Sequence, residues 1–140
     1  MKIKHGDYLR YKIPRDWVIE EDPECTSLYA KNGKGVITLS FYTSIECKEN
    51  IEEYIREMAK KFVEQSDIKV DNESFSLDET KKDKIVIYNT GITPEDNCFW
   101  KIWLIAKYPK IIIATYNCEE KTEEIEIANK IIDSFKFKNL

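Results

Sequence analysis

Hydrophobic positions along the chain follow two periods, which predict different elements. One stretch has the three- and four-residue spacing of a single helix face. Its apolar residues are Ile51, Tyr54, Ile55, Met58, Ala59, Phe62 and Val63. Asn50 is a favourable N-cap, and Glu53 stands where a capping box places a carboxylate. The pattern predicts an amphipathic helix from about Asn50 to Gln65, with its apolar stripe on a sheet.

The last third of the chain predicts a hairpin followed by a covering helix. Two runs rich in β-branched and aromatic residues meet at Pro109 and Lys110. Apolar runs of this kind are typical of strands that are covered on both faces. A helical period then returns from about Thr122, with its apolar face formed by Ile125, Ala128, Ile131, Ile132 and Phe135. The hairpin is therefore expected in the middle of a sheet, and residues 134–137 are expected to pack back on it.

Shorter stretches predict the remaining strands. They are 8–13, 27–31, 35–42, 68–71, 74–77 and 84–89. The first ends at Pro14, which cannot donate to a strand ladder, so it is predicted to be an edge strand. The next residues form a turn that delivers Trp17 to the core, and Glu20 to Glu24 form an acidic loop. Asn32 and Gly33 mark a hairpin turn, since both tolerate a positive φ.

The order of elements predicts an α+β fold. Strands joined by short turns are antiparallel neighbours, and helices must cover the apolar faces of their sheet. We expect an antiparallel β-sheet flanked by helices, which is a three-layer α/β/α sandwich. No repeat or linker divides the 140 residues, so the whole chain, 1–140, is predicted to be one domain.

Charge and hydropathy remove several classes of function. The net charge is −4 and no long basic block is present, which disfavours sequence-independent binding of nucleic acid. No apolar run is long enough to span a membrane, and no signal peptide is recognisable at the amino terminus. We therefore expect a cytoplasmic protein that binds neither nucleic acid nor membrane. The sequence indicates no oligomeric state.

Residues that carry catalytic or metal chemistry are sparse or scattered. The four cysteines are Cys25, Cys47, Cys98 and Cys118, and no two have the spacing of a metal-binding pair. His5 is the only histidine and is expected in a mobile tail, which leaves no imidazole for a catalytic triad. The acidic residues are expected on solvated surfaces. We predict no metal, no cofactor and no enzymatic activity, and an enzyme that uses carboxylates is the least favoured alternative.

Three short motifs resemble the opening, middle and end of PsbP-like α/β/α sandwich proteins. The opening is Pro14 followed by Trp17, the long helix begins with Asn50 and Tyr54, and the last helix ends with Ser134 and Phe135. The resemblance covers nearly the whole chain in its order of elements. It implies a PsbP-like fold, nearest to small bacterial families of unknown function and to chaperones of type VI secretion effectors. The activities in that superfamily are mostly binding, and the matched positions are scaffold positions, so the resemblance assigns no site residue.

One face of the predicted strand 97–108 is the candidate site. The opposite face is a clean core face, whereas this one mixes large apolar side chains with lysines. Its residues are Phe99, Lys101, Trp103, Ile105 and Lys107. Such a face is either a second core layer under a helix or a partly open apolar groove that binds a partner, with the lysines at its rim.

The leading hypothesis from the sequence is a non-catalytic protein-binding module, chaperone-like or immunity-like, whose partner is a protein that the sequence does not identify. The alternative is a small-molecule-binding domain with a pocket between sheet and helix. That pocket would be lined by Trp17, Tyr54, Trp100 and Tyr116. A contiguous exposed apolar patch favours the first hypothesis, and a closed cavity favours the second.

Overall fold

An eight-stranded antiparallel sheet forms the centre of the molecule, which the computed structural model describes over residues 1–140. Its path runs β3-β4-β5-β10-β9-β8-β6, and β7 also pairs with β8. The strands are β3 (Trp17–Glu21), β4 (Cys25–Ala30), β5 (Gly35–Thr43), β6 (Lys69–Val70), β7 (Ser76–Leu77), β8 (Ile85–Thr93), β9 (Cys98–Lys107) and β10 (Lys110–Cys118). We call this the large sheet.

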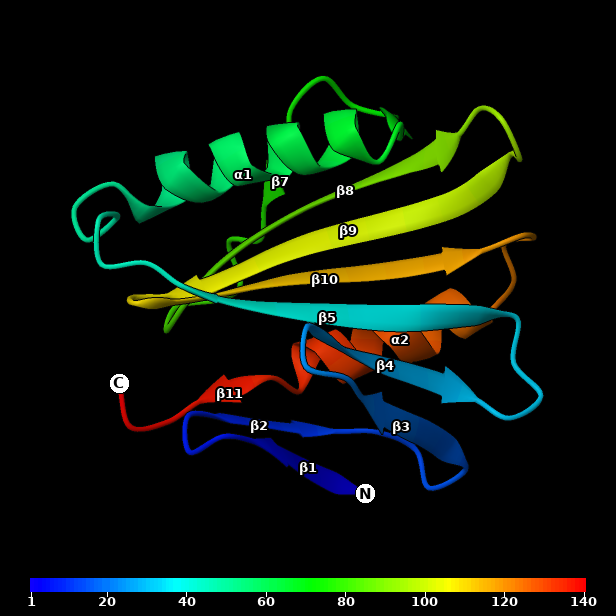
Figure 1. Ribbon diagram of the computed structural model, residues 1–140, viewed down its shortest axis with the longest axis horizontal. Helices are drawn as coiled ribbons and strands as arrows, with labels where there is room; N and C mark the ends of the chain where they lie inside the picture. The colour runs from blue at the N-terminus through cyan, green and yellow to red at the C-terminus, as the bar shows by residue number, and fades with distance from the viewer.

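A second, three-stranded sheet lies against one face of the large sheet and is called the small sheet. Its order is β1-β2-β11, with β1 (Lys2–His5), β2 (Leu9–Lys12) and β11 (Lys136–Phe137). The helices are α1 (Ile51–Gln65) and α2 (Glu124–Asp133). Figure 1 shows α1 along β8 and β9, α2 beyond β5 and β10, and the small sheet at the opposite end from α1. This mostly antiparallel sheet with two helices confirms the α+β class.

The two helices cover different faces of the large sheet. Alternate residues of β9 belong to two separate core clusters: Ile102 and Leu104 pack with Ile55 of α1, whereas Trp103 and Ile105 pack with the buried side of α2. The period-two geometry of a strand produces this division, since successive side chains point to opposite faces. The apolar runs of β9 and β10 are explained by cover on both sides, as the sequence predicted.

The predicted hairpins and helices are confirmed. The strands β9 and β10 pair with Trp103 opposite Ala114, and β4 pairs with β5 across the turn at Asn32 and Gly33. Helix α1 begins one residue after Asn50, although the Asn50 side chain makes no capping hydrogen bond. The apolar stripe of α1 is only partly covered: Ile55, Ala59 and Val63 are buried, Ile51, Met58 and Phe62 are half-buried, and Tyr54 is 36% exposed.

The amino-terminal predictions need correction. Residues 9–12 form the central strand of the small sheet, not an edge strand, because β1 pairs on one side and β11 on the other. His5 is not in a mobile tail: it ends β1, and its ring stacks on Phe41 at 3.6 Å between centroids. Part of the predicted acidic loop is strand β3, which begins at the buried Trp17.

The Glu124 carboxylate joins α2 to the hairpin of β4 and β5. It accepts hydrogen bonds from the backbone N–H groups of Lys34 (3.1 Å) and Gly35 (2.8 Å) and from the Tyr116 hydroxyl (2.9 Å). The start of β5 approaches β10 so closely that position 35 requires glycine, since a Cβ there would lie 2.6 Å from the Asn117 carbonyl oxygen. Burial, and then the bond to Glu124, raise the pKa of Tyr116, so this contact joins a neutral phenol to a carboxylate.

Candidate functional site

The face of β9 that the sequence singled out is mostly core. Trp103 is 4% exposed and Ile105 is fully buried, both in the cluster formed with α2. The prediction of an open apolar groove centred on Trp103 is therefore wrong, because the apolar side of α2 covers that part of the sheet. The alternative interpretation, a second core layer under a helix, is correct for Trp103 and Ile105.

The remaining three residues of that prediction do not form a common rim. Phe99 is half-buried, with the Lys121 ammonium 4.9 Å from its ring centroid. Lys107 lies at the opposite end of β9. Only Lys101 and Trp103 line the same cleft, which lies between the large sheet and α2.

The four aromatic residues of the predicted small-molecule pocket do not meet. Trp17 and Tyr116 belong to the core cluster on the α2 side of the large sheet, and Trp100 packs against the cluster on the α1 side. Tyr54 lies on α1 and is partly exposed. The sheet separates the two pairs, so this residue set is wrong as the lining of one pocket.

The most distinctive surface is the outer face of the small sheet, which we call the basic face. Strands β1 and β2 alternate strictly: the inward positions Ile3, His5, Leu9 and Tyr11 are buried or half-buried against the core. The outward positions are all basic. Together with the carboxy-terminal residues they form the set Lys2, Lys4, Arg10, Lys12, Lys136 and Lys138.

Strand pairing places like charges directly opposite one another on this face. Lys2 pairs with Lys12, Lys4 pairs with Arg10, and Arg10 also pairs with Lys136 of β11. Like charges at directly opposed positions destabilise an antiparallel pair. The register of the small sheet is thus set by its inward apolar side chains, and the outward side chains oppose it electrostatically.

No carboxylate compensates the basic face. The three ion pairs of the structure involve Arg56, Lys81 and Lys84, which lie elsewhere. Arg10 donates only to the carbonyl oxygens of Leu9 (2.9 Å) and Gly6 (3.5 Å). Six of the 22 basic residues of an overall acidic chain therefore gather on one face whose strands hold no acidic residue.

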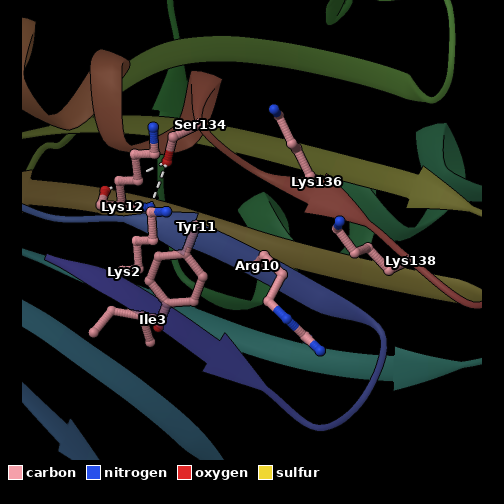
Figure 2. Close-up of a pocket in the computed structure, with 8 residues that line it drawn as sticks. All are labelled: Lys2, Ile3, Arg10, Tyr11, Lys12, Ser134, Lys136 and Lys138. Carbon is pink, nitrogen blue, oxygen red and sulfur yellow. Dashed lines mark hydrogen bonds between the residues drawn. The ribbon is translucent and has the colours of Figure 1, made fainter.

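A hollow of about 320 Å³ lies on the basic face. Figure 2 shows the side chains that line it, with the basic ones reaching over the small sheet from β1, β2 and the carboxy-terminal segment. Ser134 stands at the end of α2, where its hydroxyl oxygen accepts a hydrogen bond from the Lys12 backbone N–H at 2.8 Å. This bond anchors β2 to the helix and leaves the Lys12 side chain available to solvent.

Sequence reasoning missed this surface because its halves lie at opposite ends of the chain. A local signal was present: Lys2 and Lys4, and then Arg10 and Lys12, stand two residues apart, which places each pair on one side of a strand. That signal needed a strand at residues 2–5, and this stretch was interpreted as a tail.

Comparisons with known proteins show the fold and no more. No family model matches the sequence, and no curated protein matches it. A crystal structure from Bacteroides thetaiotaomicron VPI-5482 is similar, with a TM-score of 0.68 and 14% identity over 94% of this chain. The chain spans less than half of that structure's length, 45%.

A second similar structure is LpqN, described as involved in cell envelope biogenesis of Mycobacterium tuberculosis. Its TM-score is 0.59, with 14% identity over 99% of this chain and 90% of that one. At this identity the likeness concerns the backbone arrangement alone. No helix of the present structure has both the length and the apolar character needed to cross a membrane.

Proposed function

We propose that this chain is a non-catalytic protein-binding module, and that its basic face takes an acidic, extended segment of a partner protein. The observation that carries the proposal is the register of the small sheet. It sets Lys2 against Lys12, and Arg10 against both Lys4 and Lys136, with no carboxylate among them. A partner's Asp and Glu side chains would supply the missing charges and remove the repulsion.

The simplest competing explanation for the lysines is that they protect a sheet edge from unwanted pairing. This explanation accounts for only some of the residues of the basic face. Lysines on an edge strand discourage unwanted pairing, which suits Lys2 and Lys4 of β1. Arg10 and Lys12 lie on the central strand, which has no free edge to protect. Their charge needs another reason, and recognition of an anionic partner supplies one.

A protein segment suits this face better than a long polyanion does. The four residues of β1 extend over roughly 13 Å, about the reach of a short peptide strand. The outward positions of β1 and β2 offer no aromatic ring on which a base could stack. Elsewhere the chain has an excess of acidic residues, which would repel the continuation of a nucleic acid or an anionic membrane beyond the face.

The free edge of β1 adds a second mode of contact. In the small sheet β1 pairs only with β2, so one row of its backbone N–H and C=O groups has no partner strand. An extended segment could pair with that row while its acidic side chains meet the lysines, which is the usual arrangement of β-strand addition.

The proposal also includes the fold relationship and the general role that the sequence led us to expect. A PsbP-like three-layer relationship is supported by the order of elements and by the cover on both faces of the large sheet. The chaperone-like or immunity-like role in the cytoplasm rests on the sequence alone. The cell-envelope description belongs to LpqN and is not carried over to this chain. Binding through a surface is the part that the basic face supports most directly.

The test is a charge reversal with a matched control. A labelled peptide of about twelve residues that alternates Glu with Val should bind the wild-type chain, with affinity that falls steeply as salt rises. The variant Arg10→Glu with Lys12→Glu should lose this binding. The variant Lys60→Glu with Lys61→Glu makes the same charge change at exposed positions of α1 and should retain most of it.

Parallel titrations with a single-stranded oligonucleotide and with vesicles containing anionic lipid test the class of partner. Equal losses in the two charge-reversal variants would mean that only net charge matters, which contradicts the proposed site. Tighter, saturable binding of the oligonucleotide or the vesicles would replace the acidic segment as the occupant of the basic face.

A further inference from the structure

A second hollow, separate from the basic face, lies between the large sheet and α2. It measures about 450 Å³, which is within the usual size of small-molecule sites. Val86 and Tyr88 of β8 and Trp103 of β9 contribute its sheet side. Helix α2 and the segment 78–84 that precedes β8 supply the polar walls.

Lys101 is the central group of this cleft. Its ammonium donates to the Asn129 side-chain oxygen at 2.7 Å and lies 5.2 Å and 5.1 Å from the ring centroids of Tyr88 and Trp103. Burial lowers the pKa of Lys101. An ammonium has three N–H donors, and only one has a hydrogen-bonded partner here.

Two of the three carboxylates that line the cleft are engaged with other groups. Asp78 accepts from both the backbone N–H and the hydroxyl of Thr80, and Asp133 pairs with Lys81 at 3.2 Å. Glu126 is exposed and forms no ion pair. Lys101 is thus a half-buried cation without a direct ion pair, although the nearby charges of Asp133, Glu126 and Asp78 oppose the effect of burial on its pKa.

Lys84 adds a second cation to the lining. Its side chain is only 7% exposed, and its carboxylate partner, Asp83 at 3.3 Å, is not among the residues that line the cleft. A buried lysine is unfavourable without a partner, and the pair with Asp83 meets that need for Lys84. Asp83 compensates the charge of Lys84, so the Lys101 ammonium, with two N–H donors free, is the group that suggests a ligand of opposite charge.

We propose that the cleft between β8, β9 and α2 binds a small organic anion, whose carboxylate or phosphate oxygen accepts hydrogen bonds from the free N–H groups of Lys101. The Tyr88 and Trp103 rings border the body of the ligand. The site would make the chain a two-site binding protein. It uses none of the residues of the basic face, so either proposal can fail without the other.

The experiment follows the Trp103 indole and Asn129 amide signals by NMR during titration with citrate and, separately, with inorganic phosphate. Saturable shifts are expected for at least one anion, and the two arms distinguish a carboxylate from a phosphate ligand. The variant Lys101→Met retains the aliphatic stem and should weaken binding at least about tenfold, the usual loss for a charge-assisted hydrogen bond. Lys107→Met, on the same strand but outside the cleft, should bind like wild type.

A second variant separates binding from folding. Asn129→Asp is nearly isosteric and places a carboxylate beside Lys101, where it competes with the ligand. It should weaken anion binding about as much as Lys101→Met while the chain remains folded and the melting temperature does not fall. Absence of a saturable shift with both anions up to about 20 mM, or unchanged affinity in Lys101→Met and Asn129→Asp, would overturn the proposal.

Discussion

The small sheet differs from the centre of the large sheet in how many of its faces are buried. Both faces of β9 and β10 are covered, so Ile102 and Trp103, adjacent in sequence, are buried in two different cores. The small sheet has one covered face, and its outer face carries only basic residues on β1 and β2. Packing explains nearly every side chain in the first region and only half of the side chains in the second.

That difference separates residues needed for folding from residues available for function. Trp103 is prominent in sequence, yet its burial explains it completely. Lys12 is inconspicuous in sequence, yet nothing in the packing or ion pairing of the small sheet explains its charge. The basic face consists of charges that no carboxylate of the fold pairs with, and substitutions in the two regions test the distinction.

The largest effect is expected in the centre of the large sheet. Trp103→Ala removes a ring packed between β9 and α2 and should lower the free energy of unfolding by about 3–5 kcal/mol. Urea denaturation of the variant and of Tyr42→Ala, an exposed aromatic control, measures the difference. A loss below about 1 kcal/mol for Trp103→Ala would mean that α2 does not hold this face closed.

A smaller loss is expected at the edge of the α1 contact. The sequence alone predicts 3–5 kcal/mol for Phe62→Ala because it places the ring in the core. The structure leaves Phe62 half-buried, so about 1–3 kcal/mol is now expected, in proportion to the area removed from water. If Phe62→Ala lowered the free energy of unfolding as much as Trp103→Ala does, Phe62 would be fully buried, contrary to the structure.

Substitutions on the basic face are expected to stabilise the chain, whereas those in the core destabilise it. Arg10→Glu with Lys12→Glu turns like-charge pairs into opposite-charge pairs across β1, β2 and β11, each worth about 0.2–1 kcal/mol. The melting temperature should therefore rise at low salt, and the gain should shrink at high salt. A lower melting temperature at both salt concentrations would show that these cations stabilise the fold, which would remove the main reason for assigning them to binding.

The smallest effect concerns His5, on the inward side of the small sheet. Burial, opposed by Glu21 and assisted by Lys110, lowers the pKa of His5 in the folded state. As pH falls through about 6.5, His5 is protonated first in the unfolded chain, which lowers the free energy of unfolding. The folded state therefore has its full stability with respect to His5 above that pH and loses some of it below. Because the ring is half-exposed, the decline is expected to be slight.

Melting curves of wild type and His5→Gln at pH 7.5 and pH 5.5 isolate this contribution from that of the carboxylates. Wild type should lose more stability than the variant between the two values. Equal losses would mean that stacking on Phe41 does not desolvate the imidazole.

The sequence determined the elements whose signals are local. The period of α1, the apolar runs of β9 and β10, and the turn at Asn32 and Gly33 are each local signals, and the position of each element was predicted correctly. The turn does not use the positive φ that the sequence suggested, since neither Asn32 nor Gly33 has one. The sequence also predicted the α+β class and a covering helix ending near Phe135. These features depend on backbone preferences and on the alternation of apolar side chains, which neighbouring residues carry by themselves.

Only the tertiary structure decided which apolar face is covered and which charges are brought together. Whether Trp103 is core or surface depends on where α2 lies, and that helix is more than twenty residues away in the chain. The basic face unites residues 2–12 with residues 136–138, and the Lys101 cleft unites β8, β9 and α2. Such sites arise from pairing between distant segments, whose register is set by core packing, so a local pattern reveals at most one part of each site.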